Sequence, residues 1–253
     1  MVLYLEEKLQ YYTMDLEISH AALKELVVAN RILANEGVVD AFGHVSVRHP
    51  KNPERYIMAC SRSPGIVTIA DLMEYTLDGD PIDQQGRSMY AERHIHGGIY
   101  EVRSDLHSVI HSHSHAVIPF GLTGAEIRPV FHMGSTMLGP IPIWDISDKF
   151  GDTTLLVLNM EQGRDLARGL KHGQIALMRG HGCVVGAETI KKAVMMAVYL
   201  EDNAKLQMQA MQMGQPRYMT AEEIRLCSER IGGDLAIDRA WEYWSIRAGY
   251  SDI

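Results

Sequence analysis

The stretch VIHSHSH at residues 109–115 decides how the rest of the chain is interpreted. Its polar and apolar residues fit a strand, in which side chains leave on alternating faces. His111 and His113 then share one face, while Ile110 and Ser112 share the other. Neutral imidazole is a common ligand of divalent transition metals, and a strand holds two of them without a long loop to order. The stretch therefore predicts half of a metal site, which needs further ligands from elsewhere in the chain.

Length and composition limit the architecture, the partners and the location. The 253 residues fit one large domain, so we predict a single domain over 1–253, with a core at 19–215 and C-terminal helices at 220–253. A formal net charge of −8 without a Lys/Arg cluster argues against a nucleic-acid or anionic-membrane partner. Three cysteines without a CxxC motif indicate a reducing compartment. Because no apolar run reaches signal-peptide or membrane-span length, we expect a cytoplasmic protein.

Two glycine-flanked histidines mark further strand ends. Gly43 interrupts an apolar run just before an alternating strand begins, and it places His44 at the start of that strand. Gly180 and Gly182 surround His181 directly after the apolar strand at 175–178. Glycine lets the backbone bend sharply where a side chain would block it. His181 is therefore a candidate third imidazole at such a bend.

A helix and a turn add an acid and a set of donors. Apolar residues repeat at helical spacing over 89–102, and Glu92 near the start of this helix is predicted to reach back over the end of the histidine strand. The turn SRSPG at 61–65 is rich in hydroxyl, amide and guanidinium donors, among them Ser61 and Arg62. Such a turn suits an anionic group.

These motifs together resemble the class II aldolase/adducin family. The resemblance covers roughly residues 19–215 and rests on the order and spacing of GHVS at 43–46, the turn at 61–65, Glu92, the His111/His113 pair and GHG at 180–182. It implies an α/β fold, a three-layer α/β/α class II aldolase-like domain around a central, mostly antiparallel sheet. It also implies a homotetramer with sites near subunit interfaces.

The resemblance also implies roles at the metal. His111, His113 and His181 match the three imidazole ligands, and Glu92 matches the catalytic carboxylate that can also bind the ion. Three imidazoles leave coordination positions open, as in catalytic sites, and such an ion stabilises enolate-like charge as a Lewis acid. We expect one divalent ion per subunit, Mn, Zn, Fe or Co, with Mn or Zn favoured.

Departures from the sugar-phosphate aldolases indicate a different substrate. His44 stands where those enzymes have a phosphate-binding Asn, and Tyr90-Ala91 stand where they have two serines. The chain is instead similar to a decarboxylase branch that acts on hydroxylated aromatic or pyridine dicarboxylates. That similarity lies in HSHSHAVIPF at 111–120, RPVFHM at 128–133 and LMRGHG at 177–182, although His115 replaces an expected Pro.

The expected activity is thus a metal-dependent decarboxylation of a small hydroxylated ring carboxylate. Glu92 or His44 would supply the proton that replaces carbon dioxide, and Arg62 would hold a second anionic group bidentately. The other candidate substrate-binding residues are Ser61, Gly43 and His132.

The same residues also fit other functions. A class II aldolase acting on an unphosphorylated hydroxy-ketone would release an aldehyde, and a non-haem iron oxygenase on the same fold would consume dioxygen. An adducin-like structural module would have no activity. His44 can also serve only to bind a backbone carbonyl, and Arg62 only to face water. His96, His107 and His115 receive no role.

Overall fold

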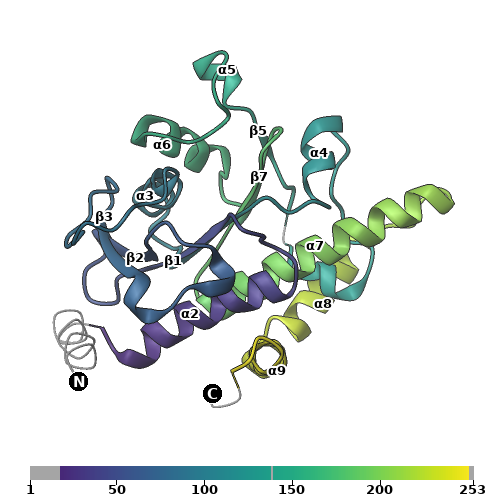
Figure 1. The fold of residues 1–253 in the computed structure, drawn as a ribbon. Coiled ribbons are helices and arrows are strands. Elements are labelled where there is room, and N and C mark those ends of the chain that lie inside the picture. Colours follow the sequence, from purple (N-terminus) through teal and green to yellow (C-terminus); the bar gives the residue numbers. More distant parts are fainter. Residues whose placement is uncertain (1–17, 138, 251–253) are drawn as a thin grey trace.

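A mixed sheet runs through the middle of the molecule. The computed structural model describes residues 18–137 and 139–250, and within them the sheet has seven strands in the order β3-β2-β1-β4-β7-β6-β5 (Figure 1). Neighbouring strands are antiparallel except β5 and β6, which are parallel. The strands are β1 His44–Arg48, β2 Arg55–Ala59, β3 Leu72–Thr76, β4 Ser108–Ser112, β5 Ile143–Trp144, β6 Ile175–Met178 and β7 Gly182–Ala187. The histidine strand is β4, at the centre of the sheet.

Helices cover both faces of the sheet. One face packs against α2 (His20–Asn35), α7 (Ile190–Met213) and α9 (Asp234–Arg247), and Figure 1 shows α2 and α7 side by side along it. The other face packs against α3 (Arg93–Val102) and α6 (Met160–Gly169). This arrangement confirms the predicted α/β/α layers. Within residues 18–137 and 139–250, the remaining helices are α4 Ile118–Thr123, α5 Ser147–Phe150, α8 Ala221–Ile231 and the short 3-10 segments η1 Pro64–Ile66, η2 Ile69–Asp71 and η3 His132–Thr136.

Alternation along β4 assigns its side chains to the two cores, as predicted. Ile110 belongs to the core beneath α2 and α7, whereas Val109 belongs to the core beneath α3 and α6. His111, two residues after Val109, therefore faces the α3/α6 side. His111 is thus on the side of the sheet that α3 covers, and Glu92 is the residue that precedes α3.

The C-terminal helices pack against the rest of the chain. α8 contacts η3, and α9 contacts both α2 and α7. Trp241 and Trp244 of α9 are buried in the core that α2 and α7 share. The single-domain interpretation stays a prediction. Among the described helices, none is both long and apolar enough to cross a membrane.

Candidate metal centre

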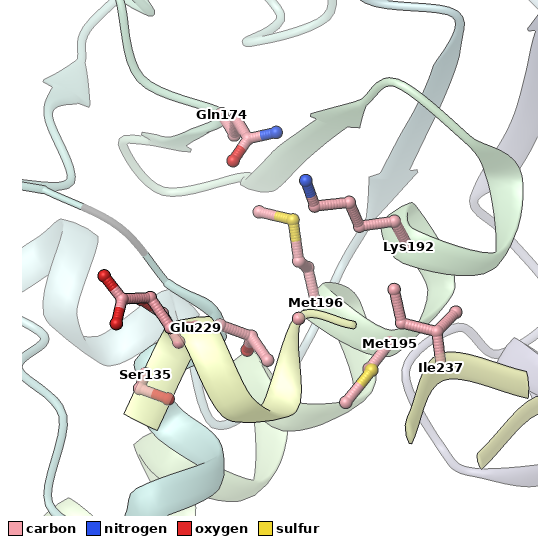
Figure 2. A pocket seen from close by; sticks show the side chains of 10 residues that line it. Ser135, Gln174, Lys192, Met195, Met196, Glu229 and Ile237 are labelled. Carbon is pink, nitrogen blue, oxygen red and sulfur yellow. The ribbon is translucent and has the colours of Figure 1, made fainter. Parts of the chain in front are cut away.

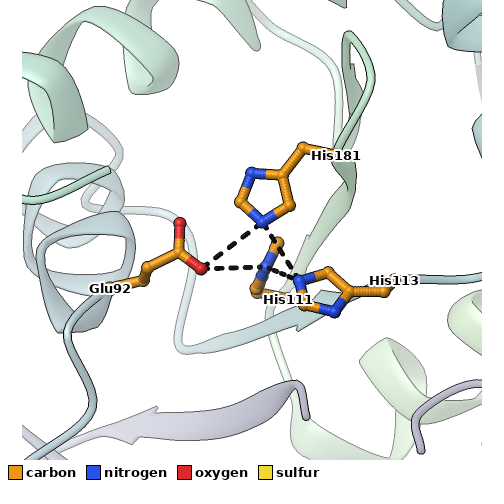
Figure 3. A group of neighbouring side chains, drawn as sticks. All are labelled: Glu92, His111, His113 and His181. Carbon is orange, nitrogen blue, oxygen red and sulfur yellow. Dashed lines mark hydrogen bonds and ion pairs between the residues drawn. The ribbon is translucent and has the colours of Figure 1, made fainter. Parts of the chain in front are cut away.

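Four side chains converge on one point (Figure 3). His111 lies in β4, one residue before its end, and His113 is the first residue after β4. His181 lies in the bend between β6 and β7, and Glu92 is the residue before α3. The Nε2 atom of His113 lies 3.3 Å from Nε2 of His111 and 3.0 Å from Nε2 of His181. Oε2 of Glu92 lies 3.4 Å from Nε2 of His181 and 3.6 Å from Nε2 of His111. The four residues named from the sequence as ligands therefore meet in space.

The spacing and the proton arrangement of this cluster fit a divalent ion. Metal–nitrogen bonds of about 2.0–2.1 Å at right or tetrahedral angles separate neighbouring ligand atoms by about 2.8–3.4 Å. Nδ1 of His111 donates to the carbonyl of Cys183 (3.1 Å), and Nδ1 of His181 donates to the carbonyl of Leu155 (2.9 Å). Because carbonyls only accept, the neutral rings direct the Nε2 lone pairs into the cluster. Lone pairs this close repel each other unless a cation lies between them.

Burial sets the charge states of the ligands. It lowers the pKa of His111 well below its ordinary value. The pKa of His113 is also lowered, mainly by burial and to a smaller extent by the neighbouring His181. Burial raises the pKa of Glu92, but the hydrogen bond with His181, the charges at His111 and His181 and the hydrogen bond from Val157 together outweigh burial and lower that pKa to about 2. Oε1 of Glu92 also accepts from the backbone N–H of Val157 at 2.9 Å. Neutral imidazoles and an ionised carboxylate are the forms that bind metals.

Local backbone geometry explains why glycine surrounds His181. A Cβ at Gly182 would lie 2.1 Å from the backbone oxygen of Ser112, so β7 can pair with β4 here only without a side chain. Gly180 has φ +66, in the left-handed region. Leu155, whose carbonyl holds His181, also has a positive φ of 65, which is uncommon for a branched residue. The bend at Gly180 thus positions His181, and the carbonyl of Leu155 orients its ring.

His44 lies beside this cluster and begins a buried hydrogen-bonded chain. Its ring lies 5.1 Å from that of His111, its partner in the β1–β4 register, and 4.7 Å from that of Tyr90. Nδ1 of His44 lies 2.6 Å from Nε2 of His96. Nδ1 of His96 lies 2.6 Å from the hydroxyl of Ser46. His96 has no role predicted from the sequence, although its position one helical turn after Glu92 was the available signal.

An ion pair and hydrogen bonds hold the predicted anion-binding turn against neighbouring residues. Nε of Arg62 lies 3.2 Å from a carboxylate oxygen of Asp71 and also donates to the carbonyl of Ile66. The phenol of Tyr90, which packs on His44, donates to the carbonyl of Arg62. The turn therefore adjoins the site, but the Arg62 guanidinium is paired with Asp71 in this arrangement.

The other predicted substrate residues differ in their distance from the cluster. Gly43 has φ +96, and a Cβ there would lie 3.0 Å from the carbonyl oxygen of His111, so this residue adjoins the site. The backbone N–H of Ser61 donates to the carbonyl of Ser88. His132 lies in η3, where it lines a hollow together with residues 217–219 and the side chains of Glu223 and Cys227. None of the four ligands lines that hollow, and the substrate roles of all three residues stay predictions.

A further pocket lies on the other side of the sheet (Figure 2). Its volume is about 260 Å³, and Met195 and Met196 of α7 line it together with Ile237 of α9. These methionines belong to the core beneath α2 and α7. The pocket contains none of the predicted site residues and is separate from the metal centre.

Comparison with known proteins identifies the family. The model for the class II aldolase and adducin N-terminal domain matches residues 24–208. The chain belongs to the class II aldolase and adducin family. Family membership confirms the predicted resemblance, and the residues matched include all four converging ligands.

Relatives in this family support an enzyme of decarboxylase or aldolase type. The chain is 30% identical to decarboxylase tropJ of Talaromyces stipitatus, over 84% of this chain and 88% of that protein. It is 25% identical to 3,4-dihydroxyphthalate decarboxylase of Arthrobacter keyseri, over 89% and 94% of the two chains. The names of these relatives confirm the predicted similarity to the decarboxylase branch.

A solved structure supports the fold. The L-fuculose 1-phosphate aldolase of Glaciozyma antarctica PI12 superposes with a TM-score of 0.76 at 24% identity, over 92% of this chain and 90% of that one. At that identity the likeness concerns the fold alone. It agrees with the predicted class II aldolase-like layers.

Proposed function

We propose that this protein is a divalent-metal-dependent decarboxylase of a hydroxylated aromatic or pyridine carboxylate. The observation that carries the proposal is the cluster of buried Glu92 and His111 with partly buried His113 and His181, in a chain related to named decarboxylases. His44, rather than a phosphate-binding amide, lies beside that cluster. The proposed assembly is a cytoplasmic homotetramer without a nucleic-acid or membrane partner.

The four clustered side chains would hold the ion, with Mn or Zn favoured. Bound there, a divalent ion supplies Lewis acidity to adjacent substrate oxygens, a ring hydroxyl and its neighbouring carboxylate. Val157 fixes one oxygen of Glu92, so the carboxylate keeps its Oε2 directed at the cluster. Glu92 can therefore bind the ion through Oε2 or move a proton at that atom.

Aromatic side chains would enclose the ring. Tyr90 packs against His44 on one side of the site. Phe42 is 67% exposed, and its ring lies 6.4 Å from that of His113. Apolar rings here would exclude water from a bound aromatic substrate and contribute stacking.

The turn at 61–65 would hold the second anionic group of the substrate. The backbone carbonyls of Gly65 and Val67 accept from the guanidinium of Arg31, which anchors the turn to α2. In this proposal Arg62 exchanges its Asp71 partner for the substrate carboxylate, which guanidinium binds bidentately.

Aldol cleavage of an unphosphorylated hydroxy-ketone is the second candidate, because membership of this family supports an aldolase-type function equally. It would use the same ligands and differ in its product, an aldehyde instead of carbon dioxide. An iron-dependent oxygenase would differ from both in consuming dioxygen.

The first test measures carbon dioxide release and proton uptake on a panel of hydroxy-phthalates and hydroxypyridine dicarboxylates, with metal-stripped protein resupplied with Mn(II) or Zn(II). We expect release to require the metal and to fall by about 100-fold or more in His113→Ala, because one ligand is lost. His107→Ala is the matched control, since this histidine is exposed and lies just before β4.

Two outcomes would contradict the proposal. If the wild type released no carbon dioxide from any compound of the panel but formed an aldehyde or consumed dioxygen in parallel assays, one of the alternatives would be favoured. Metal-dependent release that is unchanged in His113→Ala would place the reaction outside the cluster.

A further inference from the structure

Four buried polar side chains form one continuous chain at the interface between α3 and β1. From the metal centre inward they are His44, His96, Ser46 and Tyr100, each at most 4% exposed. The Ser46 hydroxyl lies 2.7 Å from the phenol oxygen of Tyr100. The guanidinium of Arg48 packs over the Tyr100 ring at 4.8 Å and donates to the carbonyls of Tyr100 and Arg103, which fixes the inner end of the chain.

Counting donors and acceptors gives this chain a direction. The hydrogen-bond partners of the Tyr100 phenol oxygen among the described residues are the Ser46 hydroxyl and the backbone N–H of Val109, and an N–H can only donate. The phenolic proton must therefore go to the oxygen of Ser46. The proton of Ser46 then goes to Nδ1 of His96, its other partner. The opposite direction leaves a buried O–H without an acceptor, which folded proteins avoid.

The same count fixes both imidazoles. His96 accepts at Nδ1, so its neutral ring carries the proton on Nε2 and donates it to Nδ1 of His44. Neutral His44 accepts at Nδ1 and must carry its own proton on Nε2. Both rings are neutral, because an imidazole that accepts a hydrogen bond at one nitrogen carries only one N–H proton. Burial, which lowers the pKa of His96 to about 3, favours the same form of that ring.

We propose that Tyr100, Ser46 and His96 are positioning residues that hold His44 as a neutral Nε2–H donor toward an anionic oxygen of the bound substrate. This inference rests on the proposed function, because a carboxylate substrate supplies that oxygen. His44 then stabilises charge on the carboxylate or on the ring oxygen by a hydrogen bond and does not act as a base. A site with a fixed donor here selects substrates with an acceptor oxygen and disfavours those with a cationic or N–H group in that place.

The proton positions can be observed without any activity measurement. A neutron crystal structure of the deuterated wild type should show deuterium on Nε2 of His44 and on Nε2 of His96. The hydroxyl deuterium of Ser46 should point to His96, and that of Tyr100 to Ser46. Deuterium on Nδ1 of His44 would overturn the inference.

Variants at His96 test the consequence for catalysis. In His96→Phe the donor to His44 is lost, and we expect kcat to fall about 10- to 100-fold with metal content and KM little changed. In His96→Gln the amide can donate to His44 and accept from Ser46, so kcat should stay within several-fold of the wild type. His94→Gln is the control, because His94 lies on the same helix but does not belong to the hydrogen-bonded chain. Equal losses in His96→Phe and His96→Gln, or wild-type kcat in both, would overturn the positioning role.

The two proposals fail separately. A wild type that releases no carbon dioxide contradicts the proposed function. The neutron structure still decides the direction of the hydrogen bonds from Tyr100 to His44. A wild type that decarboxylates while His44 carries its proton on Nδ1 contradicts only the further inference.

Discussion

At the scale of single residues, burial keeps four histidines at the candidate site in their neutral form. Burial lowers the pKa values of His44, His96, His111 and His113. An unfolded histidine takes up a proton near pH 6.5, but these folded histidines do so only at lower pH. The unfolded state therefore binds more protons below pH 6.5, and stability falls as the solution becomes more acidic.

His96 gives a measurable instance of this linkage, because its folded pKa is about 3. Between pH 7 and pH 5.5 the metal-free wild type should lose about 1 kcal/mol more stability than His96→Gln, which lacks the titrating group. Urea unfolding at the two pH values measures both losses. An equal loss in the two proteins would show that His96 titrates alike in the folded and unfolded states.

At the scale of elements, the close packing of α3 on α6 positions Glu92. The helix predicted from residue 89 begins only at Arg93, and Glu92 is the residue that precedes it. A Cβ at Gly98 of α3 would lie 2.4 Å from the carbonyl carbon of Gly163 in α6. The two backbones therefore touch, and any added atom must push α3 away from α6.

Gly98→Ala should accordingly affect both stability and the metal centre. We expect a loss of about 1–3 kcal/mol from overpacking and a weaker affinity for Zn(II), because Glu92 moves with α3. Chemical unfolding and metal titration measure these effects. Gly233→Ala is the control, since nothing lies within 4 Å of its added Cβ and its φ is −78°. Equal stability and equal Zn(II) affinity in the two variants would contradict the view that the close approach of α3 to α6 positions Glu92.

At the scale of the whole molecule, we propose that four copies of the chain assemble. Family resemblance predicts a homotetramer, and the chain exposes large apolar side chains such as Leu235 (88%) and Phe42 (67%), the latter beside His113. We expect light scattering after size exclusion to give four times the mass of one chain at micromolar concentration. The mass of a single chain in a fully active sample would contradict a tetramer whose sites depend on neighbouring subunits.

The sequence by itself predicted the four candidate metal ligands and the α/β/α layers, because local patterns marked the single residues and the family resemblance assigned them to one site and implied the layers. Strand alternation put His111 and His113 on one face, and glycines marked the bend at His181. The polar partners depended on the tertiary structure. His44 and His96 are 52 residues apart, and they meet only because α3 packs against β1. The carbonyl of Leu155, which orients His181, belongs to a segment without a motif. Periodicity fixes the direction of a side chain within its own element, whereas packing between elements fixes which buried donors and acceptors meet.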